Sequence, residues 1–397
     1  MNRNDHTLPS GWKKLRLDQV SRIVGGSTPS TDRTEFWDGT IAWTTPKDLS
    51  NLEGPYLDGS SRKITEAGLQ SCASEILPAN SVLFSSRAPI GLVAINRVPM
   101  ATNQGFKSFI PYRDVADAKY LYHWLKTNRS YLDSLGNGAT FKEVSKAIVS
   151  RVELPVPPLS EQKRLAAILD HADAIRRKRQ QALRLTDDFL RSVFLDMFGT
   201  SEAPKCSRTS LSDHLEFITS GGRGWAQYYS EEGDKFIRSL DVQMNEINDT
   251  EMIRVRAPKN AEADRTRIRV GDVLLTITGS LIGRVAPVTE THEGAFISQH
   301  VAILRMREIN PEFASYALSS EECQQQIARN QTGQTKPGLN FDQIRRITIP
   351  QPSKAAEELF SKILKVRRKT LNSQRRACAE AETLFQSLQH RAFTGQL

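Results

Sequence analysis

The pattern of apolar and polar residues divides the chain into two kinds of segment. Residues 1–158 and 200–352 contain short strand-like runs, such as the alternating residues 253–256 and the continuous apolar run 273–277. Residues 160–198 and 354–393 contain no glycine or proline, and Gly199 and Gly395 follow them as helix stops. The pattern predicts two strand-rich modules, each followed by one long helix.

Each module also has a predicted short helix, at residues 118–127 or 312–319, and ends in a proline-containing strand, at 152–158 or 347–352. Ser160 follows two prolines and is expected to cap the first long helix. At ~1.5 Å per residue each long helix would extend roughly 55 Å, which favours a coiled coil over an ordinary globular helix.

The two halves of the chain repeat each other. Asp18 and Gly26 recur as Asp213 and Gly221, both 195 residues later. From residues 138 to 198 the register carries without a gap onto residues 333 to 393. Self-similarity at one offset over this length indicates a duplicated module-plus-helix unit.

Both long helices carry apolar residues at coiled-coil a and d spacing, which predict a seam between them. The predicted seam contains Leu165, Ile168, Ala172, Ile175, Phe189 and Val193 in the first helix, and Phe360, Ile363, Leu384 and Leu388 in the second. The alternative is two separate helices that each cover their own module. A second apolar set, which includes Phe194 and Phe385, lies off this seam and is expected to be covered by the modules or by another subunit.

Length and composition limit the class of protein. The 397 residues exceed what one hydrophobic core usually serves. No apolar run long enough for a membrane span occurs and the N-terminus is polar, so a membrane or secreted protein is not expected. The cysteines, Cys72, Cys206, Cys323 and Cys378, form no Cys-x-x-Cys pair, which fits a reducing cytoplasm.

The charge balance suggests an anionic partner. The chain carries 54 basic and 45 acidic residues, a net charge of +9, and nucleic acid is the commonest partner of such proteins. The excess is uneven, because residues 200–352 carry 18 basic and 20 acidic residues. No segment is a polybasic tail, so a polyanion would be bound through local patches.

Candidate nucleic-acid contacts are basic, amide and hydroxyl side chains in turns and loops, since these groups bind phosphates and base edges. In the first module they are Arg87, Asn103, Gln104, Lys107, Asn137 and Lys142. In the second module they are Arg223, Arg265, Arg267, Thr278, Arg284, Gln299, Gln334 and Lys336. Arg265 and Arg267 are expected on one face of a strand, and a solvated face balanced by nearby carboxylates is the alternative.

No catalytic motif is recognised. Residues 279–284 lack the Lys-Ser/Thr ending of a phosphate loop and are predicted to be a turn between strands. Glu161-Gln162-Lys163 resembles the end of a nuclease motif but has no aspartate on a strand upstream of it, so a solvated helix start is expected. No histidine pairs with a cysteine at metal-ligand spacing. The chain is predicted not to be an enzyme; a nuclease or methyltransferase with an unrecognised site remains an alternative.

Motifs at residues 25–29, 41–48, 154–162, 166–170 and 194–199 resemble those of one known family, the specificity subunits of type I restriction-modification enzymes. Leu-Pro-Val-Pro-Pro-Leu-Ser-Glu-Gln at 154–162, Ala-Ala-Ile-Leu-Asp at 166–170 and Phe-Leu-Asp-Met-Phe-Gly at 194–199 are similar to the central region of that family. Gly-Gly-Ser-Thr-Pro at 25–29 and Ile-Ala-Trp-Thr-Thr-Pro-Lys-Asp at 41–48 are similar to the start of a target-recognition domain. The pattern is weaker in the second half, where residues 350–353 lack the Glu-Gln.

The resemblance implies an α+β protein with target-recognition domains at 1–158 and 200–352, and long spacer helices at 159–199 and 353–397 that form an antiparallel coiled coil. Each domain would read one half of a bipartite, asymmetric site on double-stranded DNA. Two modification subunits and the restriction subunits would be partners and would hold S-adenosylmethionine, ATP and Mg²⁺, while this chain binds no cofactor or metal. The alternative is a scaffold protein whose two modules bind protein and not DNA.

Overall fold

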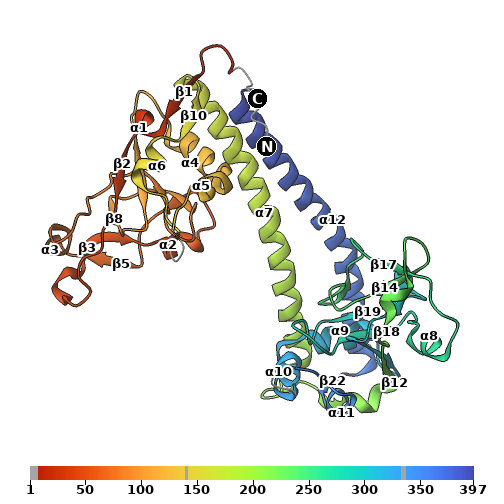
Figure 1. Cartoon of the computed structure of the whole chain (residues 1–397). Coiled ribbons are helices and arrows are strands. Elements are labelled where there is room, and N and C mark those ends of the chain that lie inside the picture. The colour runs from red at the N-terminus through yellow and green to blue at the C-terminus, as the bar shows by residue number, and fades with distance from the viewer. Residues whose placement is uncertain (1–7, 139–141, 332–336) are drawn as a thin grey trace. The chain divides into compact units, whose positions relative to one another are not determined.

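The computed structural model describes residues 8–138, 142–331 and 337–397. It contains two compact units, unit 1 (residues 1–181 and 375–397) and unit 2 (residues 182–374). Each unit combines one strand-rich module with parts of both long helices, α7 (Leu159–Phe198) and α12 (Lys354–Thr394) (Figure 1). None of the helices in these described ranges has the length and apolarity that a membrane span requires.

The module of unit 1 is built on a five-stranded sheet in the order β2-β9-β6-β7-β4. Its strands are Ser21–Gly25, Lys107–Pro111, Val82–Phe84, Val93–Asn96 and Tyr56–Leu57. A second sheet has β5 (Arg62–Ile64), β3 (Trp37–Thr44) and β8 (Met100–Thr102), and β1 (Lys13–Arg16) pairs with β10 (Glu153–Val156). The short helices are α1 (Leu17–Val20), α2 (Pro46–Ser50), α3 (Glu66–Gln70), α4 (Ala118–Thr127), α5 (Arg129–Ser134) and α6 (Lys146–Ser150).

The module of unit 2 has two four-stranded sheets, β12-β21-β18-β19 and β13-β17-β14-β20, and the pairs β11-β22 and β15-β16. In chain order, β11 to β22 are Ser207–Ser210, Leu215–Ser220, Tyr229–Ser230, Asp234–Ile237, Val242–Gln243, Glu246–Ile247, Ile253–Val255, Asp272–Thr276, Val285–Pro287, Phe296–Ile297, Val301–Met306 and Thr348–Gln351. The helices are α8 (Ala261–Thr266), α9 (Pro311–Ser319), α10 (Glu321–Asn330) and α11 (Phe341–Arg345).

The two modules share backbone contacts that the repeat predicts. The antiparallel pair β1–β10 corresponds to β11–β22, and the parallel pair β3–β8 corresponds to β14–β20. Gly26 and Gly221 occupy the same repeat position, and a Cβ on either would collide with backbone oxygens of the neighbouring strand. Only glycine permits this close approach, which explains why both copies have it.

Each long helix is tied to its module by the same backbone contact. Gln162 is fully buried, and its side-chain oxygen accepts a hydrogen bond of 2.9 Å from the amide of Asp117, the N-cap of α4. In unit 2 the carboxylate of Glu357 accepts the amide of Asn310, the N-cap of α9. The expectation that residues 161–163 are a solvated helix start is therefore wrong for Gln162. Nor is Ser160 the helix cap, because α7 already begins at Leu159.

The long helices run antiparallel within each unit. In unit 1, Arg176 of α7 pairs with Glu382 of α12 at 3.2 Å. In unit 2, Asp187 of α7 pairs with Arg367 of α12. Also in unit 1, Arg164 of α7 donates to the carbonyl of Leu397, just after α12, at 2.8 Å. Also in unit 2, the ring of Phe194 of α7 lies 5.4 Å from that of Phe360 of α12. Rising residue numbers on α7 therefore meet falling numbers on α12 in both units.

The buried face of each long helix differs in part from the seam that the sequence predicted. Phe189, Ile175 and Leu384 were expected in the seam, but they are 63%, 53% and 58% exposed. Residues expected off the seam, including Phe194 and Phe385, are buried instead. The reason is that each helix packs on a module as well as on the other helix. Of the remaining predicted interface residues, Leu165 and Phe360 are buried, while Ile168, Ala172, Val193, Ile363 and Leu388 are half-buried.

Candidate nucleic-acid interface

Three predicted contacts of the first module meet around Glu143, a residue that the sequence analysis did not identify. The Nε of Arg87 donates to Glu143 Oε2 at 2.7 Å, and the Nζ of Lys107 donates to Glu143 Oε1 at 3.1 Å. Asn137 exchanges two backbone hydrogen bonds of 2.9 Å with Glu143. Arg87 lies in the turn after β6, and Lys107 begins β9. Three separate chain segments thus converge on one position.

This group, which we call the Glu143 clamp (Arg87, Lys107 and Glu143), retains a net positive charge. Burial alone would raise the pKa of Glu143, but hydrogen bonds from Arg87 and Lys107 outweigh it and lower the pKa. The carboxylate is therefore ionised at neutral pH and cancels one of the two cations. The Arg87 side chain is 45% exposed, whereas that of Lys107 is 14% exposed.

The other predicted contacts of this module also have partners within it. Asn103 Oδ1 accepts a hydrogen bond of 2.9 Å from the Gly105 amide, and Gln104 accepts one from the hydroxyl of Thr28. Lys142 donates to Asp133 at 2.6 Å. These contacts hold the side chains in the surface turns where the sequence analysis placed them.

The second module brings Thr278 and Gln299 together. The Thr278 hydroxyl contacts Nδ1 of His300, and Gln299 Nε2 lies 3.2 Å from His300 Nε2. Thr278 also forms a backbone bridge with Gly338. Arg284 is half-buried in the same turn. Gln334 and Lys336 lie outside the described residues.

The prediction that Arg265 and Arg267 lie on one strand of this module is wrong. Arg265 lies in helix α8, which Asn260 caps by accepting the amide of Ala263 at 2.9 Å. Arg265 donates to the Ser220 carbonyl at 3.1 Å, close in sequence to the exposed Arg223. Arg267 follows the helix and donates to the carbonyl of Gly294 at 3.1 Å. The structure therefore does not align Arg265 and Arg267 on one strand face.

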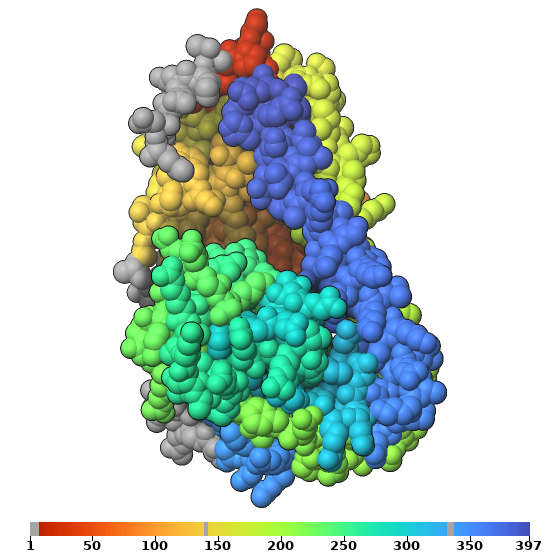
Figure 2. Space-filling model, turned by 90° about the vertical axis from the view of Figure 1, so that its right-hand side faces the viewer, coloured from red at the N-terminus to blue at the C-terminus, as the bar shows by residue number. Residues whose placement is uncertain are grey.

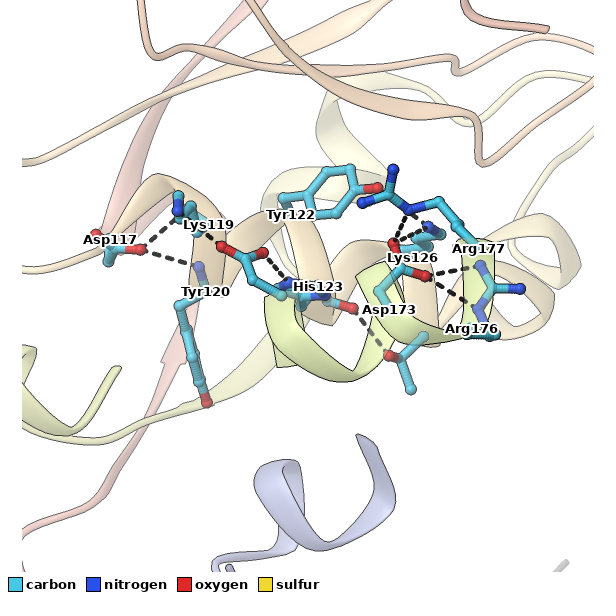
Figure 3. A network of polar contacts seen from close by, with 11 residues as sticks. Asp117, Lys119, Tyr120, Tyr122, His123, Lys126, Asp173, Arg176 and Arg177 are labelled. Carbon is cyan, nitrogen blue, oxygen red and sulfur yellow. Dashed lines mark hydrogen bonds and ion pairs between the residues drawn. The ribbon is translucent and has the colours of Figure 1, made fainter. Parts of the chain in front are cut away.

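A polar network, buried at His123 and Asp173, joins α4 to α7 in unit 1 (Figure 3). His123 Nε2 lies 2.8 Å from Asp170, which also accepts from Lys119 at 2.7 Å. Asp173 accepts hydrogen bonds from Arg176 at 2.7 Å and from Arg177 at 3.0 Å. The sequence analysis missed this network.

The spacing of its members on α7, three and four residues apart, was the available signal, because such positions share one helix face. Burial would raise the pKa of Asp173, but Lys126, Arg176 and Arg177 outweigh this effect and lower it. The network therefore fixes the module on its helix by charge pairing. Within the described ranges, no group of three or more His, Cys, Asp or Glu side chains is placed to hold a metal ion.

Comparison with known proteins identifies the family. The sequence matches the type I restriction modification DNA specificity domain over residues 9–185 and 239–381, which is most of the chain. The chain belongs to this family. The family that the sequence motifs suggested is therefore confirmed, and the motif at residues 154–162 lies inside the matched region.

Curated specificity subunits are similar to parts of the chain. The MjaIX subunit of Methanocaldococcus jannaschii is 38% identical over 53% of this chain and 49% of its own length. The EcoR124I/EcoR124II subunit of Escherichia coli is 30% identical over 41% of each chain. The chain thus matches about half the length of these relatives or less. The MjaVIII subunit, also from M. jannaschii, aligns over 98% of this chain and 94% of its own length at 21% identity.

Solved specificity-subunit structures share the fold. The S subunit of the type I restriction-modification system from M. genitalium has a TM-score of 0.61 at 14% identity, and the match covers 99% of this chain and 98% of that one. A chain from a structure of type I R-M complex assembly has a TM-score of 0.55 at 19% identity, covering 98% and 100%. These likenesses confirm the α+β class with two long helices.

The long helices of this family member expose apolar side chains. On α7 these include Ile175, Leu185 and Phe189, and on α12 they include Val366 and Leu384. Figure 2 shows one side of α12, in blue, at the molecular surface. Three of these exposed residues, Ile175, Phe189 and Leu384, belong to the seam that the sequence predicted to be buried.

Proposed function

We propose that the chain is the non-catalytic, sequence-reading subunit of a type I restriction-modification complex and that it binds double-stranded DNA. Membership in the specificity family is the observation that carries this proposal. Each module would read one half of a bipartite site. The half-sites would differ, because equivalent positions in the shared backbone carry different side chains: Arg87 corresponds to Thr278, and Glu143 to Gly338.

The long helices would act as spacers between the half-sites. Helix α7 has 40 residues, and at ~1.5 Å per residue this corresponds to roughly 60 Å. One turn of the DNA duplex measures roughly 34–36 Å. A helix longer than one duplex turn supports a gap of unread base pairs between the two recognised segments.

The chemistry would belong to partners. Modification subunits, in our proposal two, would dock on the exposed apolar residues of α7 and α12 and hold S-adenosylmethionine. Restriction subunits would hold ATP and Mg²⁺. The complex would act in the cytoplasm, and this chain would bind no cofactor of its own.

The test is binding of a labelled duplex library by the full chain, alone and with its modification subunit, combined with methylation-site sequencing. We expect two short motifs at fixed spacing and binding that weakens as salt rises, since phosphate contacts release counterions. A protein-binding scaffold would show no dependence on DNA sequence even with the modification subunit present. That result would refute the proposal.

A further inference from the structure

The Glu143 clamp restrains the orientation of one arginine at the module surface. Arg87 uses its Nε to bind Glu143 Oε2, and Lys107 holds the other oxygen of the same carboxylate. Among the described residues, the two terminal nitrogens of Arg87 have no hydrogen-bond partner. The hydrogen bond through Nε therefore restrains the guanidinium and leaves Nη1 and Nη2 available to a ligand.

We propose that Arg87 reads a guanine in the half-site of the first module and that Glu143 is the positioning residue which orients it. This inference rests on the proposed DNA-binding function. Guanine offers two acceptors, O6 and N7, on its major-groove edge, and arginine bonds both with two parallel N–H groups. That geometry benefits from a guanidinium whose orientation is restrained, and the charge-assisted hydrogen bond from Nε to Glu143 supplies such a restraint.

A contact of Arg87 with a DNA phosphate would not explain why the Glu143 carboxylate is bound to Arg87. Phosphates attract any nearby cation with little demand on its orientation, and affinity grows with the number of phosphates neutralised. Glu143 cancels one positive charge of the clamp and so weakens such attraction. A base contact gains from the carboxylate, because orientation and not net charge distinguishes guanine from the other bases.

The second module shows that the fold does not need the clamp. Thr278 and Gly338 form the same backbone bridge as Arg87 and Glu143, without a carboxylate or a cation. The strand pairing also matches, since Lys107 pairs with Gly25 and the buried Ala302 pairs with Ser220. The ion pairs are therefore an addition to the first module, which points to recognition and not to folding.

The experiment measures binding of a duplex library by the full chain assembled with its modification subunit. The variants are Arg87→Lys, which keeps the charge but removes the planar pair of donors, and Glu143→Gln, which removes the carboxylate. Glu153→Gln is the matched control, because Glu153 pairs with Lys14 at 2.8 Å in the β1–β10 ladder. Thermal unfolding of each variant verifies that it is folded.

We expect Arg87→Lys to reduce discrimination by about 5- to 150-fold at a single G·C position of one half-site, with the other positions unchanged. Glu143→Gln should relax the same position to a smaller extent, because a glutamine oxygen still accepts from Nε. The control should leave the recognised sequence unchanged.

Three results would overturn the inference. Arg87→Lys could leave the preferences unchanged, or it could relax a position that is not G·C. Glu143→Gln could instead strengthen binding evenly on all sequences, as expected if Arg87 contacts a phosphate. In each case the wild-type complex would still select two spaced motifs. If it selected none, the proposed function itself would have failed.

Discussion

Phe194 and Phe189 lie on the same helix, five residues apart, and the structure predicts opposite outcomes for their truncation. Phe194 is 3% exposed and packs against four aromatic rings in unit 2, with centroid distances of 5.0 Å to Phe198, 5.2 Å to Tyr316, 5.4 Å to Phe360 and 6.1 Å to Phe313. Phe→Ala changes in cores destabilise by about 3–5 kcal/mol. The ring contacts place Phe194→Ala well inside this range, at about 4 kcal/mol.

Phe189→Ala should change the free energy of unfolding by less than about 1 kcal/mol, because an exposed ring loses little burial. The assay is thermal and urea unfolding of the full chain, followed by probes in each unit, since two units need not unfold in one step. For a unit of this size, about 4 kcal/mol corresponds to roughly 8–16 °C in the melting temperature of unit 2. Unit 1 should melt as in the wild type.

Equal destabilisation by the two variants would refute this reasoning. It would mean that the heptad seam drawn from the sequence, with Phe189 inside it, is the buried one. The same pair separates folding from assembly: Phe189→Ala should weaken binding of the modification subunit without loss of stability, if the exposed apolar residues are the docking surface.

Three further predictions concern DNA binding and pH. Lys142→Ala should weaken binding evenly across sequences and reduce the slope of log affinity against log salt by about 1, measured by titration at several salt concentrations; an effect confined to one base position would contradict a phosphate contact. The Asp173 carboxyl has a lowered pKa in the folded chain, so its stabilisation is present above the ordinary value of 3.8 and is lost as pH falls below it. Asp173→Asn should therefore destabilise unit 1 by roughly 2 kcal/mol at neutral pH, somewhat below the value for a fully buried pair, and flatten its acid unfolding profile. Burial, only partly offset by Asp249, lowers the pKa of His292, so unit 2 should lose stability as pH falls below the ordinary value of 6.5. His292→Gln should remove this pH dependence. A wild-type urea midpoint that stays the same between pH 7 and 5 would contradict the prediction.

Local signals in the sequence located several elements closely. The short helix predicted at residues 118–127 is α4, and Asp117 caps it by accepting two backbone amides. The long helices end at the expected glycines, and the repeat predicted equivalent strand pairs in the two modules. Each of these features depends on hydrogen bonds or steric limits within a few residues, or on comparison of one half of the chain with the other.

The errors arose where distant residues decide the outcome. Arginine alternation suggested a strand at 265–269, but Asn260 caps helix α8, which runs to Thr266 and includes Arg265. Gln162 was expected to be solvated, but its side chain bonds the amide of Asp117, which lies 45 residues away in the loop before α4. The sequence did not predict a role for Glu143, because its partners Arg87 and Lys107 are 56 and 36 residues away in sequence.

The sequence by itself determined the duplication, the two long helices and the family, because periodicity, end signals and motifs are properties of short segments. Only the tertiary structure decided which face of each helix is buried and which charges meet. Several apolar stripes on one helix are equally hydrophobic, and the choice among them depends on the module and the second helix that pack there. Ion pairs likewise form between side chains that folding brings together, which spacing along the chain does not reveal.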